Sequence, residues 1–122
     1  MKIYTSNYWK YKGDNGVQIS CGIPEWFKVK RRLALLFPSW ESVKRWNSVK
    51  KLQDDDPVKL REWDRFQKEY WKKLSMMGPS HVLPYLSDGD VLLCWCHKTK
   101  WCHRAILAEW LRTVCGVEVE EI

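Results

Sequence analysis

The spacing of hydrophobic residues predicts two consecutive helices in the middle of the chain. Apolar residues recur at three-residue steps over residues 40–49, behind Ser39, a favoured N-cap residue. A second pattern begins at Pro57, where Asp56 can cap the helix, and runs to about Met76. The positions expected to face inward on this second helix are Leu60, Trp63, Phe66 or Gln67, Tyr70, Trp71 and Leu74.

Shorter apolar segments predict strands on both sides of these helices. Residues 1–8 and 17–21 read as two early strands, and Val117 and Val119 alternate with glutamates as in a strand near a sheet edge. Residues 91–95 form an uninterrupted apolar run, which suits a strand buried on both faces of a parallel sheet.

The segment from Asp90 to Gly116 predicts a strand–helix–strand unit. Cys102-His103-Arg104 opens an amphipathic helix after the apolar run, and Gly116 stands where a left-handed C-terminal cap would lie. We therefore expect an α/β fold: a small three-layer domain with a mainly parallel, Rossmann-like sheet of about four or five strands. At 122 residues, the chain is expected to form a single domain over residues 1–122.

The candidate site follows from the position of this helix start. Ligands of open α/β sheets bind beyond the carboxyl ends of the strands, and a helix N-terminus favours an anion. The residues predicted to bind a phosphate-bearing ligand there are Thr5, Ser6, Cys96, Trp101, Cys102, His103 and Arg104. The helix start should also lower the pKa of the Cys102 thiol and make it a candidate catalytic nucleophile.

A structural interpretation of the same residues remains open. In it, Cys102 caps the turn, His103 bonds to the sheet and Arg104 pairs with Glu109. A third interpretation is a zinc site made by Cys94, Cys96, Cys102 and His103, whose sulfur and imidazole donors suit Zn²⁺. The spacing is not that of paired Cys-x-x-Cys knuckles, so the first expectation is that no cofactor is bound.

Charged residues are distributed unevenly along the chain, and their distribution indicates a candidate binding surface. The formal net charge is +6, and residues 28–61 contain ten Lys or Arg against four Asp or Glu. This excess favours a nucleic-acid surface, and the residues expected to supply it are Lys30, Arg31, Arg32, Lys50 and Lys51. The alternative to a nucleic-acid surface is a solvated helix face.

Among nine tryptophans, Trp95 and Trp101 are the best placed to stack on a base, although tryptophans at helical spacing more often belong to a core.

Several well-known sequence signals are missing, which argues against the functions that they mark. The chain has no signal-peptide pattern and no apolar run that could span a membrane, so a cytoplasmic protein with free thiols is expected. It also lacks a Walker loop, a Gly-x-Gly-x-x-Gly loop, a Cys-x-x-Cys pair and a Cys-x5-Arg phosphate cradle.

The segment Leu92-Leu-Cys, followed by Cys102-His-Arg and Leu107-Ala-Glu-Trp-Leu111, resembles a bacterial and phage family known as domain of unknown function 488. Further resemblance lies in residues 2–6, 17–20, 24–27 and 33–40, and in Tyr70 and Leu74. Two departures are Cys96, where many members have a nearby glutamate, and Leu36-Phe-Pro in place of Leu-Ala-Pro. The resemblance implies a small α/β fold and no particular activity.

These observations predict a small cytoplasmic α/β protein that binds a nucleotide, a nucleoside derivative or nucleic acid at the Cys-His-Arg helix start. Whether it acts on that ligand is left open. The alternative is a non-catalytic binding module, either a zinc-stabilised nucleic-acid binder or a phage protein that sequesters a nucleotide signal.

Overall fold

The computed structural model describes all of residues 1–122, and a five-stranded parallel sheet lies at its centre. The strand order is β3-β2-β4-β1-β5, and every pair is parallel. The strands are β1 (Lys2–Asn7), β2 (Gly16–Gln18), β3 (Arg31–Arg32), β4 (Val91–Cys94) and β5 (Glu118–Glu121). The expected α/β fold with a mainly parallel sheet of four or five strands is confirmed.

Four α-helices and two 3₁₀ turns connect these strands. They are η1 (Ala34–Leu36), α1 (Trp40–Val49), α2 (Pro57–Met77), α3 (Pro79–Val82), η2 (Leu83–Tyr85) and α4 (His103–Thr113). The predicted caps are present: Ser39 Oγ accepts from the Ser42 amide, and Asp56 accepts from the Val58 amide. Gly78 ends α2 with a positive φ of 74°, a conformation that costs glycine little.

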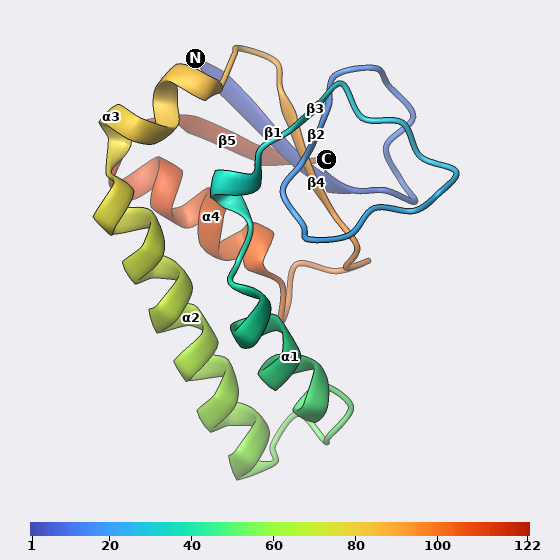
Figure 1. Cartoon of the computed structure of the whole chain (residues 1–122), viewed down its shortest axis with the longest axis vertical. Coiled ribbons are helices and arrows are strands. Elements are labelled where there is room, and N and C mark those ends of the chain that lie inside the picture. Colours follow the sequence, from blue (N-terminus) through green and yellow to red (C-terminus); the bar gives the residue numbers. More distant parts are fainter.

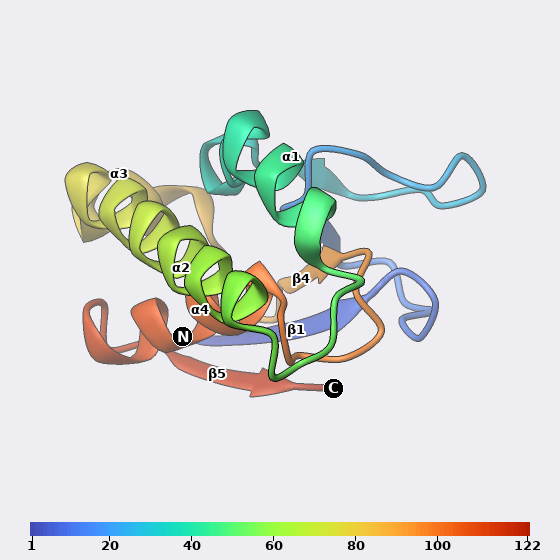
Figure 2. The same ribbon diagram turned by 90° about the horizontal axis from the view of Figure 1, so that it is seen from below.

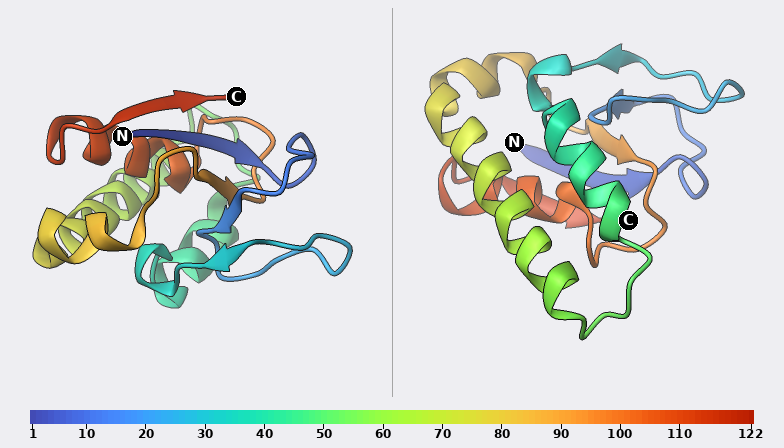
Figure 3. Two further views of the ribbon diagram at one scale, coloured as in Figure 1. Left: turned by 90° about the horizontal axis from the view of Figure 1, so that it is seen from above. Right: turned by 60° about the horizontal axis from the view of Figure 1, so that its bottom comes forward.

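The helices and the loops cover different faces of the sheet. The main core of 19 buried residues lies between the helices and strand residues such as Ile3 and Leu92, and Figure 2 shows α1 and α2 stacked over the sheet. A smaller cluster around Tyr8 and Leu93 is covered by loop side chains such as Phe27. The third layer is therefore built by loops rather than by helices, as the views in Figures 1 and 3 show.

Two details differ from the sequence expectation. Leu60 is 48% exposed, whereas its neighbour Lys59 is 4% exposed. Lys59 is buried because its Nζ donates to the Leu52 carbonyl and to Asp54, in the loop that precedes α2. Strand β3 was not predicted, because its two residues are both arginines and carry no apolar signal.

None of the helices combines the length and the apolar character that crossing a membrane requires.

Candidate functional site

The candidate site lies where β4 ends and α4 begins. Strand β4 stops at Cys94, and residues 95–102 form a loop at the carboxyl edge of the sheet. Asn7, the last residue of β1, fixes this loop through a hydrogen bond from its Nδ2 to the His97 carbonyl. The fold thereby places the loop beyond the carboxyl ends of the central strands, the position where parallel sheets bind ligands.

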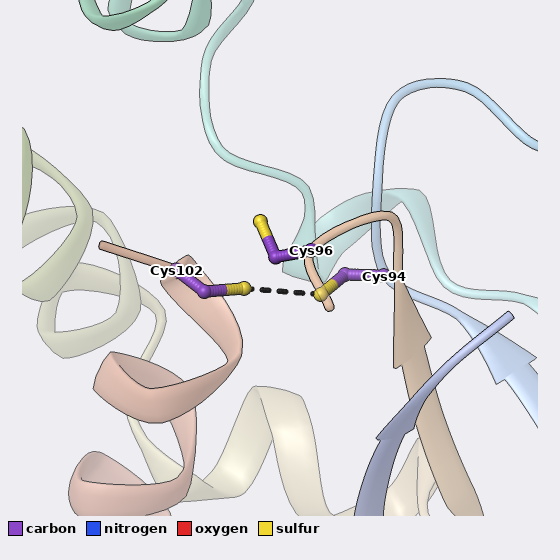
Figure 4. A group of neighbouring side chains, drawn as sticks. All are labelled: Cys94, Cys96 and Cys102. Carbon is purple, nitrogen blue, oxygen red and sulfur yellow. Dashed lines mark hydrogen bonds between the residues drawn. The ribbon is translucent and has the colours of Figure 1, made fainter. Parts of the chain in front are cut away.

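Three cysteine sulfurs meet at this edge. Cys94 at the end of β4, Cys96 in the loop and Cys102 before α4 have Sγ atoms that all lie within 4.8 Å of one another. Figure 4 shows the side chains of Cys102 and Cys94 pointing toward each other. Their sulfurs lie 3.0 Å apart. Cys94 and Cys102 are buried, whereas Cys96 is partly exposed. We call these three residues the sulfur cluster.

Arg104 holds the sulfur cluster against the last strand. It is 1% exposed, and its Nη1 donates to Cys94 Sγ at 3.0 Å and to the Cys96 carbonyl. Its Nε and Nη2 donate to Glu121 of β5. Burial alone would lower the pKa of Arg104, but Glu121 and the two nearby sulfurs raise it above its usual value. Arg104 therefore lies at the expected edge, with its guanidinium bonded to protein groups.

From the sequence, Glu109 is the candidate ion-pair partner of Arg104, but the structure shows a different carboxylate in this role. Glu109 lies 3.7 Å from Arg112 on the exposed side of α4, and the carboxylate that Arg104 contacts is Glu121. Sequence reasoning missed Glu121 because it lies in the final strand, 17 residues beyond Arg104. The only available signal was the Glu120-Glu121 pair next to a predicted edge strand.

The thiols titrate differently from the sequence expectation. Cys102 is the N-cap of α4, but its side chain makes no capping hydrogen bond. Its pKa is raised, because Cys94 and Cys96 lie beside it and because it is buried. The expectation that the helix start lowers the pKa of Cys102 is thus wrong. The pKa of Cys96 is lowered instead, mainly by the neighbouring thiols of Cys102 and Cys94.

His103 is bonded to the sheet, as the structural interpretation held. Its Nε2 lies 2.9 Å from the Ile19 carbonyl, and its ring packs edge-on against Tyr70 at 5.6 Å. Burial lowers its pKa, so the imidazole is held neutral. Because His103 is bonded to Ile19 and lies outside the sulfur cluster, the alternative four-donor zinc set considered from the sequence is reduced to three cysteines.

A cavity of about 680 Å³ opens beside the sulfur cluster, between the carboxyl edge of the sheet and α1. Its volume lies within the range of about 300–1,000 Å³ that is common for small-molecule sites. Cys94, Cys96 and His103 reach its lining. The aromatic and basic residues of the lining include Trp40, Trp46, Trp95, Trp101, Lys50, Lys51, Lys98 and Lys100. No aspartate or glutamate lines this cavity.

Trp101 forms part of the cavity wall in a conformation that is unusual for its residue type. Its φ is 63°, and it is the only non-glycine residue with a positive φ. The indole stacks on Trp46 at 5.6 Å and meets Trp63 edge-on at 5.5 Å. Its Nε1 is buried without a hydrogen-bond partner. A strained backbone that is retained in a cavity wall is typical of a functional position.

The structure brings together some of the predicted binding residues and separates others. Cys96, Trp101 and His103 line the cavity, whereas Cys102 and Arg104 lie behind it. Thr5 and Ser6 also lie outside the lining, because Thr5 bonds to Glu121 and Ser6 bonds to the Ile122 carbonyl.

The five residues of the predicted nucleic-acid surface also divide into two groups. Lys50 and Lys51, at the end of α1, line the cavity. Lys30, Arg31 and Arg32 lie at β3, outside the lining. Arg31 forms an ion pair with the buried Asp90, and Arg32 lies over the Phe37 ring.

An exposed aromatic cluster adjoins the mouth of the cavity. Trp9 stacks on His97 at 5.4 Å and lies 5.0 Å from Trp26 and 6.3 Å from Trp95. Trp95 and His97 are also cavity residues, so the exposed cluster continues the aromatic wall onto the surface.

The fold and this site define a small α/β protein with a basic, aromatic cavity at the carboxyl edge of a parallel sheet. A family model described as the active DUF488-N3 subclade matches residues 11–114, and the chain belongs to this family. The resemblance inferred from the sequence is thereby confirmed. Neither a curated protein nor a solved structure gives a significant match.

Proposed function

We propose that the cavity binds a nucleotide, either free or as a unit of a nucleic acid, and that the protein acts on it beside the sulfur cluster. The observation that carries this proposal is the lining: four tryptophans and four lysines without a carboxylate, with one of the lysines, Lys100, paired to Asp54 outside the lining. Indole rings can stack on a nucleobase, and ammonium groups neutralise phosphates.

The position of each group supports one orientation of the ligand. Lys50 and Lys51 follow the last turn of α1 and are exposed, so they suit the phosphates near the mouth. Trp40 and Trp95 are 59% and 42% exposed, so part of each indole is accessible to a base. The sulfur cluster then lies next to the bound nucleotide, with Cys96 as the accessible sulfur.

The matched subclade is described as active, which supports a reaction rather than binding alone. Cys102 was the first candidate nucleophile, but it is 1% exposed and lies behind the cavity lining. We therefore assign the contact with the ligand to Cys96. We also propose a cytoplasmic location, supported by five cysteines that are all free, because thiols persist in a reducing compartment.

Calorimetric titration with nucleoside mono-, di- and triphosphates and with short single-stranded oligonucleotides tests the proposal. Lys50→Gln combined with Lys51→Gln should weaken binding at least about tenfold, since each charge-assisted contact contributes about 1.5–3 kcal/mol. Lys44→Gln is the control, because Lys44 lies on α1, the helix that Lys50 and Lys51 follow, is exposed and does not line the cavity. Equal effects of both changes, or no binding of any compound, would refute the proposal.

Turnover is measured separately by chromatography of the same mixtures after incubation. Conversion of a bound nucleotide supports an enzyme. Binding of a free nucleotide without conversion favours the sequestering protein, the phage alternative considered from the sequence.

A further inference from the structure

The sulfur cluster has the composition and geometry of a metal site. Its three donors come from the end of β4, the following loop and the residue before α4, so the crossover connection brings them together. Cys94 Sγ and Cys102 Sγ lie 3.0 Å apart, and all three Sγ atoms lie within 4.8 Å of one another. A tetrahedral zinc ion with Zn–S bonds of about 2.3 Å separates two sulfurs by about 3.8 Å, which falls between these two distances.

Arg104 also contacts the sulfur cluster. Three thiolates and one divalent cation carry a net charge of −1, and buried charge needs a partner. Nη1 of Arg104 lies 3.0 Å from Cys94 Sγ and 3.7 Å from Cys102 Sγ, while Nε and Nη2 bind Glu121, so Arg104 stabilises the sulfurs by donating hydrogen bonds rather than by neutralising the site. Donation from a fixed guanidinium to ligand sulfurs is the type of outer contact that orients metal ligands.

We propose that Cys94, Cys96 and Cys102 bind one soft d¹⁰ cation, with Zn²⁺ as the first choice. Three protein ligands leave one of the four zinc positions for a water molecule or a ligand atom, the arrangement of catalytic rather than structural zinc sites. Cys94 and Cys96 both reach the cavity lining, so a ligand in the cavity would have access to a cation held by them. Binding requires thiolates, so each thiol that is protonated beforehand releases its proton to solvent.

The cation would have a clear use beside a bound nucleotide. Zinc lowers the pKa of a bound water and polarises an oxygen or carbonyl that coordinates it. This use rests on the proposed function. The binding of the cation does not, because the three sulfurs meet independently of any nucleotide.

Metal-free, reduced protein titrated with Zn²⁺ and with Co²⁺ tests the site. One equivalent should bind, and Co²⁺ should produce thiolate-to-cobalt charge-transfer absorption together with the intense visible bands of a tetrahedral site. Cys96→Ser should weaken binding at least about tenfold, as expected for loss of a ligand when even outer contacts contribute 10–100-fold. Cys115→Ser is the control, since Cys115 lies outside the sulfur cluster.

A second measurement uses the unaltered chain, because replacing the buried Cys94 or Cys102 could prevent folding. Zn²⁺ should slow alkylation of Cys96 by iodoacetamide and leave alkylation of Cys115 unchanged, as read by peptide mass spectrometry. Absence of the cobalt bands, unchanged affinity in Cys96→Ser, or equal protection of both cysteines would overturn the proposal. Nucleotide titration of the zinc-free, unaltered protein keeps the two proposals separate, since nucleotide binding by the cavity lysines does not require the metal.

Discussion

Arg104 and Glu121 form a two-point contact between the first turn of α4 and the end of β5. Both Nε and Nη2 of Arg104 donate to the Glu121 carboxylate, and Nη2 lies 2.8 Å from Oε2. Thr5 of β1 donates to the same carboxylate at 2.6 Å. The helix start and the two strands β1 and β5 are therefore joined through one carboxylate at the edge where the sulfur cluster lies.

This contact predicts the outcome of replacing Arg104 with lysine. Lysine keeps the charge, but one ammonium cannot reach Glu121, Cys94 Sγ and the Cys96 carbonyl in the geometry of a planar fork. Arg104→Lys should lower the free energy of unfolding by about 2–4 kcal/mol, because buried charged groups lose their partners. Urea denaturation measures this loss.

Lys68→Gln is the control for Arg104→Lys. Lys68 pairs with Asp64 on the exposed face of α2, so its loss should change the unfolding free energy by less than about 0.5 kcal/mol. Equal stability of Arg104→Lys and the unaltered protein would show that the contact with Glu121 has no structural role.

Tyr8 predicts a loss of stability at high pH. Burial raises the pKa of Tyr8 from 10.0 to about 12, although Ser20, whose Oγ lies 2.8 Å from the hydroxyl, lowers it. The folded protein thus holds the protonated phenol more tightly than the unfolded chain does. The stabilisation is complete below pH 10 and disappears as the pH rises toward 12.

Denaturation at a series of pH values, with phenolate absorbance recorded in parallel, measures the effect. Tyr8→Phe cannot ionise and should lose less stability over this pH interval than the unaltered chain. Parallel pH profiles for the two proteins would contradict the assignment to Tyr8.

Trp40 and Trp26 predict a difference between short and long ligands. Both are exposed, at 59% and 55%, but only Trp40 lines the cavity. Trp40→Ala should weaken binding of a mononucleotide by about 1–3 kcal/mol, the usual contribution of stacking on one base. Trp26→Ala should leave mononucleotide affinity unchanged.

An oligonucleotide long enough to reach the exposed aromatic cluster should respond to both changes, because Trp26 lies 5.0 Å from Trp9 in that cluster. Calorimetry on the four protein–ligand combinations provides the measurement. A larger effect of Trp26→Ala than of Trp40→Ala on a mononucleotide would place the base outside the cavity.

The two groups of basic residues predict different salt dependence. If Lys50 and Lys51 neutralise two phosphates of a single strand, their replacement by glutamine should reduce the slope of log K against log salt by about 1.4, at roughly 0.7 per contact. Lys30→Gln with Arg32→Gln should leave the slope unchanged, because both residues lie outside the cavity lining. If only the Lys30→Gln, Arg32→Gln variant reduced the slope, the phosphates would contact the residues at β3 and not Lys50 and Lys51.

Local signals were sufficient for the helices. Ser39 and Asp56 were recognised as caps because a side-chain oxygen satisfies a backbone amide two or three residues away, within the same segment. Gly116 was recognised for a similar reason, and its φ of 67° confirms the left-handed turn after α4. The apolar run of β4 predicted a central parallel strand, and all four residues of β4 are buried in the structure.

Local signals failed where the environment comes from a distant segment. Strand β3 has two arginines and no apolar pattern, and pairing with β2 alone makes it a strand. The burial of Lys59 in place of Leu60 depends on the carbonyl of Leu52 and on Asp54, which lie across the turn before α2. The spacing of apolar residues along a helix cannot reveal a contact with a preceding loop.

The sequence by itself determined that Cys96 and Cys102 lie at the carboxyl edge of the sheet, because they fall between a strand and a helix. It also placed Arg104 at the carboxyl edge of the sheet. Only the tertiary structure decided that Arg104 bonds Glu121 and that Trp40, Lys50 and Lys51 face the same cavity as Cys96. The physical reason is that crossover connections bring these segments together across the sheet, so their contacts depend on packing rather than on spacing along the chain.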